Sequence, residues 1–246
     1  MRIREPEFHD VETPSGPMRC HIFRPDAEGA FPGIVLYSEI YQMTGPIARI
    51  AAYFAGHGYV VNVPEIYHEY EVAGTVFEYD KEGTDRGNEL KTTKTIAAYD
   101  ADAVAAVEHL AGFAACSGKV GALGFCIGGH LAFRAGMIPG VLATACFYAT
   151  DIHKRSLGAG MNDDSLDRFG DIKGELLMIW GRQDPHVSLE GRRLIRTTLE
   201  DADVNFQWHE FNGAHAFVRD EGVRYDPVLA MQGFGLSLEM FGRCLR

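Results

Sequence analysis

A cysteine between two closely spaced glycines is the residue in this chain best placed for covalent chemistry. Residues 124–129 read Gly-Phe-Cys-Ile-Gly-Gly, after an apolar run and before a helix-like stretch. This pattern predicts a strand that turns sharply into a helix, with Cys126 at the apex. Such a turn strains the apex residue and needs small neighbours two positions away on each side, here Gly124 and Gly128. A thiolate at the apex would attack reactive acyl carbons readily.

A cysteine that only packs is the competing interpretation of Cys126, since free cysteine is among the most buried residue types. Partners for proton transfer decide between the two. An elbow nucleophile is followed along the chain by an acid just beyond a strand, and then by a histidine on a late loop. Asp184 follows the apolar run 174–181, and His215 lies in Gly-Ala-His-Ala-Phe after the last predicted strand. We therefore predict that His215 is the base for Cys126 and that Asp184 orients the imidazole.

Other acids and histidines compete for these two roles. Asp151 ends an apolar run and is an alternative acid, but no turn as suitable as Asp-Pro follows it. We expect His186 in a loop or in packing, and His209 on a strand facing solvent or a helix. His130 is expected on the helix after the elbow, with a local hydrogen-bond partner. None of the four fits the order of the elbow motif as well as the pair chosen above.

Backbone N–H groups are expected to stabilise the oxyanion. One donor in such an elbow is the residue after the nucleophile, here Ile127. The second comes from the loop after the first core strand, where Ile40 is the candidate.

Apolar β-rich runs alternate with helical patterns, which predicts an α/β fold with a mainly parallel, twisted sheet flanked by helices on both faces. We expect strands at 20–23 (an edge strand), 33–37, 59–63, 119–123, 141–148, 174–181 and 204–211. Helices are expected at 46–57, 95–115, 130–137, 189–199 and 227–245. Residues 65–93 are polar and irregular, and we interpret them as a long functional or mobile loop. With no repeat or linker, residues 1–246 are predicted to form one domain.

Composition excludes several classes of function. The 246-residue chain has a net charge of −11 and no block of Lys and Arg, so nucleic acid and anionic membranes are not expected partners. No apolar run is long enough for a transmembrane helix, and no secretory signal is recognised at the N-terminus. Five cysteines without a C-x-x-C pair indicate a cytoplasmic location, and no metal or cofactor is expected. We expect a monomer or a small homo-oligomer.

Four motifs together resemble the dienelactone hydrolase (carboxymethylenebutenolidase) family. They are the elbow, Gln-Asp-Pro, Gly-Ala-His-Ala-Phe and an early Glu-Ile-Tyr, at 124–129, 183–185, 213–217 and 39–41. The match runs from about residue 18 to the C-terminus. The resemblance implies an α/β-hydrolase fold and hydrolysis of a small carboxylate-bearing lactone through a cysteinyl acyl-enzyme. The lactone would be of the dienelactone to maleylacetate type, formed in aromatic degradation.

The resemblance also implies roles for two charged residues. Glu39 matches a glutamate beside the nucleophile that takes the thiol proton when substrate binds. In the alternative interpretation it is a polar residue at a strand end, or it pairs with an arginine such as Arg49. Arg219 matches an arginine that binds the substrate carboxylate, which suits the bidentate geometry of a guanidinium. In the alternative interpretation it is a solvated arginine paired with Asp220 or Glu221.

The family further places an arginine and a tyrosine, four residues apart, before the long helix, where both touch substrate. Arg86 is the nearby arginine here, and no tyrosine stands four residues after it. The resemblance therefore assigns Arg86 to the substrate and leaves another small lactone or activated ester open. Tyr148 is expected either to line the pocket or to belong to the core.

A hydrolase of small anionic lactones or esters is thus the predicted function. One alternative is a carboxylesterase of broader range on activated esters. Another is a non-catalytic protein that uses Cys126 as a redox-sensing thiol. Asp184 and His215 count against the sensor, because a sensor needs neither a deacylating base nor a group that orients it.

Overall fold

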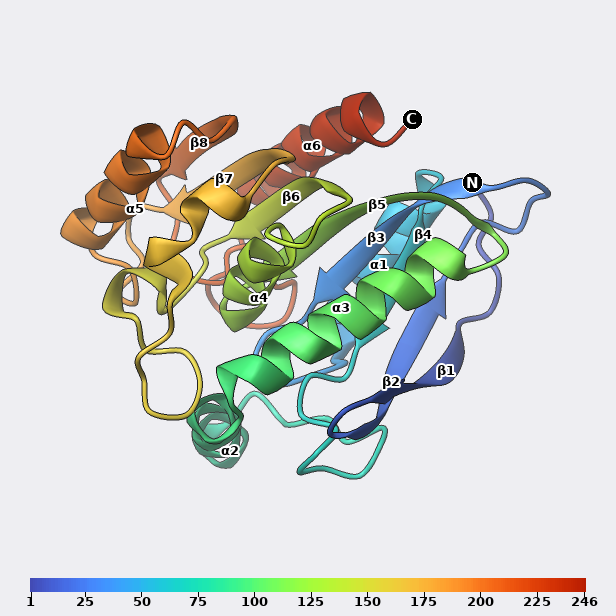
Figure 1. Cartoon of the computed structure of the whole chain (residues 1–246), viewed down its shortest axis with the longest axis horizontal. Coiled ribbons are helices and arrows are strands. Elements are labelled where there is room, and N and C mark those ends of the chain that lie inside the picture. Colours follow the sequence, from blue (N-terminus) through green and yellow to red (C-terminus); the bar gives the residue numbers. More distant parts are fainter.

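The computed structural model describes residues 1–246, and its eight strands form one sheet in the order β1-β2-β4-β3-β5-β6-β7-β8 (Figure 1). The strands are β1 Glu7–Thr13, β2 Gly16–Phe23, β3 Phe31–Tyr37, β4 Val60–Pro64, β5 Cys116–Phe125, β6 Val141–Phe147, β7 Glu175–Gly181 and β8 Phe206–Phe211. Strands β1 and β2 pair antiparallel, as do β2 and β4, and every other neighbouring pair is parallel. The mainly parallel sheet that the sequence predicts is confirmed.

Helices cover both faces of this sheet, because its central strands are apolar on both sides. They are α1 Gly45–Gly56, α2 Lys81–Thr93, α3 Ile96–Gly112, α4 Ile127–Ala135, α5 Leu189–Asp201 and α6 Pro227–Cys244, with short 3₁₀ helices at Ile152–Lys154, Ser165–Asp167 and Phe169–Asp171. One core cluster joins α3, α4 and α5 to one face, and the other joins α1 and α6 to the opposite face. No helix has the length and apolar character needed to span a membrane.

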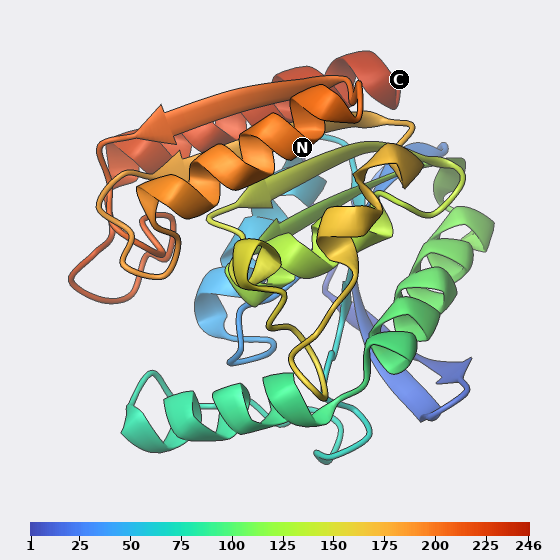
Figure 2. The ribbon, with the colours of Figure 1, turned by 60° about the vertical axis from the view of Figure 1, so that its left-hand side comes forward.

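Residues 65–93 are not wholly irregular, and that expectation was wrong for their second half. They include α2, which lies outside the layer that α3 and α4 form (Figure 2). The apolar period of a helix is missing from its sequence, because Gly83 and Gly87 take two of the three buried positions. A Cβ on Gly87 would lie 2.6 Å from the Ile40 carbonyl oxygen, so glycine lets α2 approach the loop after β3.

Strand β2 is not an edge strand as expected, since β1 pairs with its outer side. Strand β1 alternates exposed and half-buried residues and contributes little apolar surface. Its sequence therefore carries a weak strand signal.

The predicted elbow is present. Strand β5 ends at Phe125, α4 begins at Ile127, and Cys126 alone makes the turn at φ 60°, ψ −122°. A Cβ on Gly124 would lie 1.9 Å from the Gly128 carbonyl oxygen, and one on Gly128 would lie 2.3 Å from the Ser38 carbonyl oxygen. The two glycines therefore let the helix pack directly on β5 and on the end of β3.

We predict that Gly128→Ala destabilises the fold by at least about 3 kcal/mol, because the clash is with backbone that cannot move away. Gly235→Ala is the matched control, since nothing lies within 4 Å of a Cβ at that helical position. The control should be unchanged or up to about 1 kcal/mol more stable. Urea unfolding followed by circular dichroism measures both, and equal stabilities would contradict the packing described here.

Candidate active site

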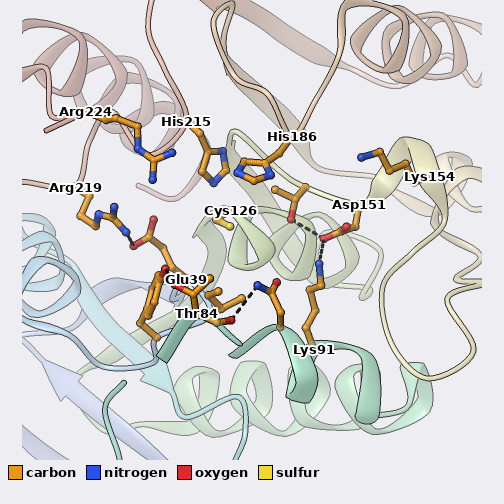
Figure 3. Close-up of a pocket in the computed structure, with 14 residues that line it drawn as sticks. Glu39, Thr84, Lys91, Cys126, Asp151, Lys154, His186, His215, Arg219 and Arg224 are labelled. Carbon is orange, nitrogen blue, oxygen red and sulfur yellow. Dashed lines mark hydrogen bonds and ion pairs between the residues drawn. The ribbon is translucent and has the colours of Figure 1, made fainter. Parts of the chain in front are cut away.

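Cys126 lies in a cavity of about 260 Å³ at the carboxyl ends of the parallel strands. Its N–H donates to the carbonyl of Phe147 at 3.1 Å, and its own carbonyl accepts from Gly129 and Thr150 at 3.0 and 3.2 Å. These bonds hold the strained turn in one conformation. The Cys126 side chain is partly exposed, and it points toward His215 (Figure 3).

Asp184 and His215 form a buried hydrogen-bonded pair beside Cys126. Asp184 follows β7 and His215 follows β8, and Asp184 Oδ2 lies 2.7 Å from His215 Nδ1. Asp184 Oδ1 accepts from the N–H of His186 at 2.7 Å, which fixes the carboxylate. Burial acts to raise the pKa of Asp184, but the bond and charge of His215 outweigh burial and hold it below its ordinary value. The structure thus brings the three expected triad residues together.

The surroundings of His215 favour its charged form. Burial alone would lower the pKa of His215, but the neighbouring Cys126 sulfur and the bond to Asp184 outweigh burial and raise it to about 10. The arrangement can therefore support a thiolate–imidazolium pair.

Tyr148 lies beneath His215 rather than in the wall of the cavity, so of its two expected places it takes the core. Its ring meets the imidazole edge to face, with centroids 4.9 Å apart, and the residue is fully buried. Its contribution is to hold His215 in place by packing.

Glu39, directly after β3, lines the same cavity and is 4% exposed. Its Oε2 lies 3.6 Å from Nη1 of Arg219. Burial raises the pKa of Glu39, although Arg219 and His215 act in the opposite direction. The carboxylate is therefore an unusually strong base for a glutamate.

Arg219 faces the cavity because a second arginine takes its acidic neighbours. The Arg49 guanidinium binds Asp220 at 2.6 and 2.7 Å and Glu221 at 2.7 Å. Arg219 itself lies over the ring of Tyr79, 4.3 Å from the centroid. The alternative pairings considered from the sequence do not form. Arg219 does not pair with Asp220 or Glu221, and Glu39 does not pair with Arg49.

Of the two expected oxyanion donors, Ile40 lines the cavity, and Ile127 is buried directly after Cys126 in the chain. The Ile40 N–H has no protein acceptor within hydrogen-bond distance. Ile127 is the first residue of α4, where a helix leaves its N–H groups without intrahelical partners.

Arg86 does not line the cavity, so the place expected for it is corrected. Its guanidinium binds Glu71 and Glu89 on another side of α2, at 2.7 and 2.8 Å. Thr84 and Asn88, four residues apart on α2, line the cavity instead. No pattern in the sequence indicated this, because α2 lacks the apolar period that would have predicted a helix.

Further polar residues in the wall were not predicted as site residues. They are Tyr41, Thr84, Asn88, Lys91, Thr150, Lys154 and Arg224. Asp151, the alternative acid, is also in the wall, but its Oδ2 is bound by Lys91 at 3.0 Å and it does not pair with a histidine. Asp151 therefore lines the cavity and does not orient a histidine base.

The other histidines take different places. His186 lines the cavity and meets His215 edge to face, with centroids 4.6 Å apart. His130 is fully buried on α4, and its Nε2 lies 2.7 Å from Ser165 Oγ. His209, on β8, does not line the cavity.

Asp184, His186 and His215 are the one group whose ligand atoms lie close enough for a metal ion, within 4.8 Å of one another. Asp184 Oδ2 and His215 Nδ1 are already bonded to each other, and Asp184 Oδ1 accepts from a backbone N–H. The donor set therefore fits a hydrogen-bonded dyad better than a metal site.

Known proteins resemble this chain over nearly its whole length. Residues 18–245 match the Dienelactone hydrolase family. A Saccharomyces cerevisiae protein named "Putative carboxymethylenebutenolidase" is 43% identical, over 97% of this chain and 92% of that protein. The "Carboxymethylenebutenolidase" of Pseudomonas sp. strain P51 is 25% identical, over 93% of this chain and 91% of that protein. A crystal structure of a "Putative Dienelactone Hydrolase" from Klebsiella pneumoniae has a TM-score of 0.84 at 19% identity, covering 99% of this chain and 100% of that one. The fold is that of the α/β-hydrolases.

The charge on His215 generates a prediction about pH. Its pKa rises from 6.5 to about 10 on folding. The stabilisation from its charge is therefore complete below about pH 6.5 and is lost as the pH rises through about 10. Cys126→Ser removes the sulfur that helps to raise the pKa of His215, so this pKa should fall in that variant. Histidine NMR titration measures this, with Cys244→Ser as the control; an unchanged pKa in Cys126→Ser would rule out the pairing.

Proposed function

This chain belongs to the dienelactone hydrolase family of carboxylic ester hydrolases, and we propose that it opens a small carboxylate-bearing lactone through an acyl-enzyme on Cys126. The observation that carries the proposal is the buried Asp184–His215 pair beside Cys126, in one cavity with Arg219 and Glu39. A reaction of the dienelactone to maleylacetate type suits this set, since it needs a nucleophile, a base and a cation for the carboxylate.

The proposed reaction has two halves. The Cys126 sulfur attacks the lactone carbonyl, and the Ile40 and Ile127 N–H groups donate to the resulting oxyanion. The ring C–O bond breaks, a thioester forms, and the leaving oxygen takes a proton from His215. Neutral His215 then removes a proton from water as the water attacks the thioester. The C–S bond breaks, the product leaves as a carboxylic acid that ionises in solution, and the restored thiolate takes back the proton that Glu39 accepted.

The Glu39–Arg219 pair supports a substrate-triggered start. A substrate carboxylate that binds Arg219 competes with Glu39 for the guanidinium, whose contact with Glu39 is long, at 3.6 Å. Glu39 released from this pair is a stronger base, because burial raises its pKa. It can then take the thiol proton of Cys126, as the resemblance implied.

Two alternatives remain distinct hypotheses. A carboxylesterase of broader range would use the same triad without needing Arg219 for affinity. A redox sensor would use Cys126 alone, and the hydrogen-bonded Asp184–His215 pair gives no support to it. Five free thiols and the small polar cavity support a cytoplasmic enzyme of small metabolites.

Removing the nucleophile or the base should abolish hydrolysis. We expect Cys126→Ala and His215→Ala each to lower kcat on dienelactone by about 10³-fold or more, because they act as one unit. Loss of dienelactone absorbance measures this, with His209→Ala as a histidine control outside the cavity. Turnover of simple aryl esters but not dienelactones would remove the substrate assignment and spare the mechanism. A Cys126 that no acylating probe labels would remove both.

Arg219→Met should lower kcat/KM for an anionic lactone by about 10–100-fold, the value of a charged hydrogen bond. It should affect a neutral aryl ester much less, because such a substrate has no carboxylate. Arg182→Met, an exposed arginine outside the cavity, is the control for net charge. Equal losses on both substrates would count against Arg219 as the carboxylate ligand.

Glu39→Gln tests the proton transfer separately. The amide cannot accept the thiol proton, so we expect slower acylation by dienelactone in single-turnover measurements. Deacylation should change less, because His215 is the base in that half. An acylation rate equal to that of the wild type would show that Glu39 has another role.

A further inference from the structure

The cavity has cations on both sides of Cys126 (Figure 3), although the whole chain carries a net charge of −11. Four basic side chains are in its wall: Lys91, Lys154, Arg219 and Arg224. Only three of its 14 lining residues are hydrophobic. A ligand that fills it must therefore be polar at both ends.

The proposed function uses only the arginine end. We propose that Lys91 and Lys154 bind a second anionic group of the substrate, so that the enzyme prefers a dianionic lactone or ester with an acid group on each side of the scissile bond. This inference rests on the proposed hydrolysis at Cys126, and it names the substrate class more narrowly.

Lys91 is held in place and has donors to spare. It lies on α2 in line with Thr84 and Asn88, which precede it by seven and three residues and line the same cavity. Its ammonium, 17% exposed, binds Asp151 Oδ2 at 3.0 Å. That is the one acceptor within hydrogen-bond distance, and an ammonium has three N–H donors.

Asp151 does not repel a bound anion strongly, because its carboxylate is already occupied. Thr150 Oγ donates to one oxygen at 2.8 Å, and Ser156 Oγ donates to the other at 3.0 Å. Together with Lys91 these donors disperse the negative charge. The turn that presents Asp151 has a left-handed backbone, φ 71°, which these contacts hold.

Lys154 supplies the surplus charge at this end. It is exposed on the 3₁₀ helix Ile152–Lys154, lines the cavity and has no acidic partner. The lysine end thus has two cations and one carboxylate. The arginine end also has two cations, Arg219 and Arg224, and one carboxylate, that of Glu39. The charged His215 is balanced by Asp184, so each end carries one net positive charge, which matches one carboxylate at each end of the substrate.

Two chromogenic esters test the inference: 4-nitrophenyl hydrogen glutarate, with one carboxylate, and its 3-carboxy-4-nitrophenyl analogue, with a second on the leaving group. The rates are divided by those of alkaline hydrolysis to remove the difference between the leaving groups. We expect kcat/KM of the wild type to favour the dianion by about tenfold. Lys154→Met should lower this ratio by about threefold to tenfold, and Lys91→Met with Lys154→Met should abolish it.

Lys173→Met is the matched control, because it removes the same charge from an exposed lysine outside the cavity and should leave the ratio unchanged. Lys154 has no ion pair, so its variant is expected to fold even if Lys91→Met does not. A wild-type ratio of one or less, or a ratio that Lys154→Met does not change, overturns this inference alone. If the enzyme hydrolyses neither ester, the proposed function is overturned as well.

Discussion

The single-residue turn at Cys126 is the constraint on which the rest of the site depends. One residue in a left-handed conformation joins β5 to α4, and only glycine at 124 and 128 lets the two elements come so close. Because Gly128 packs on the backbone at the end of β3, the same contact fixes the position of the loop that carries Glu39 and Ile40. The strain at the apex is maintained by hydrogen bonds from β6 and the loop after it.

Local pairing of charges explains how an acidic chain can hold an anionic substrate. Asp220 and Glu221 are adjacent to Arg219 in sequence, yet Arg49 on α1 binds both. This leaves Arg219 with a single long contact to Glu39 and two tyrosine rings. Ion pairs away from the cavity thus bind acids that would otherwise pair with its cations. The Lys, Arg, Asp and Glu side chains in the cavity wall sum to a positive charge, although the whole chain is negative.

Most of the fold could be predicted, because buried parallel strands and their covering helices leave strong apolar patterns. The elements that were missed lack that pattern. Helix α2 buries two glycines and one leucine, and β1 is nowhere fully buried. Because α2 was not predicted, the site residues in this segment were assigned wrongly. Arg86 was expected near the substrate, whereas Thr84 and Asn88 of this helix line the cavity.

The order of motifs along the chain was enough to predict that Cys126, Asp184 and His215 lie together at one edge of one sheet, because the carboxyl ends of parallel strands meet at the same edge. The charge at the two ends of the cavity could not be predicted in this way. Arg49 and Asp220 are 171 residues apart, and Lys91 and Asp151 are 60 apart. Which cations remain free to face a substrate depends on such distant ion-pair partners, and only the tertiary structure determines which side chains become partners.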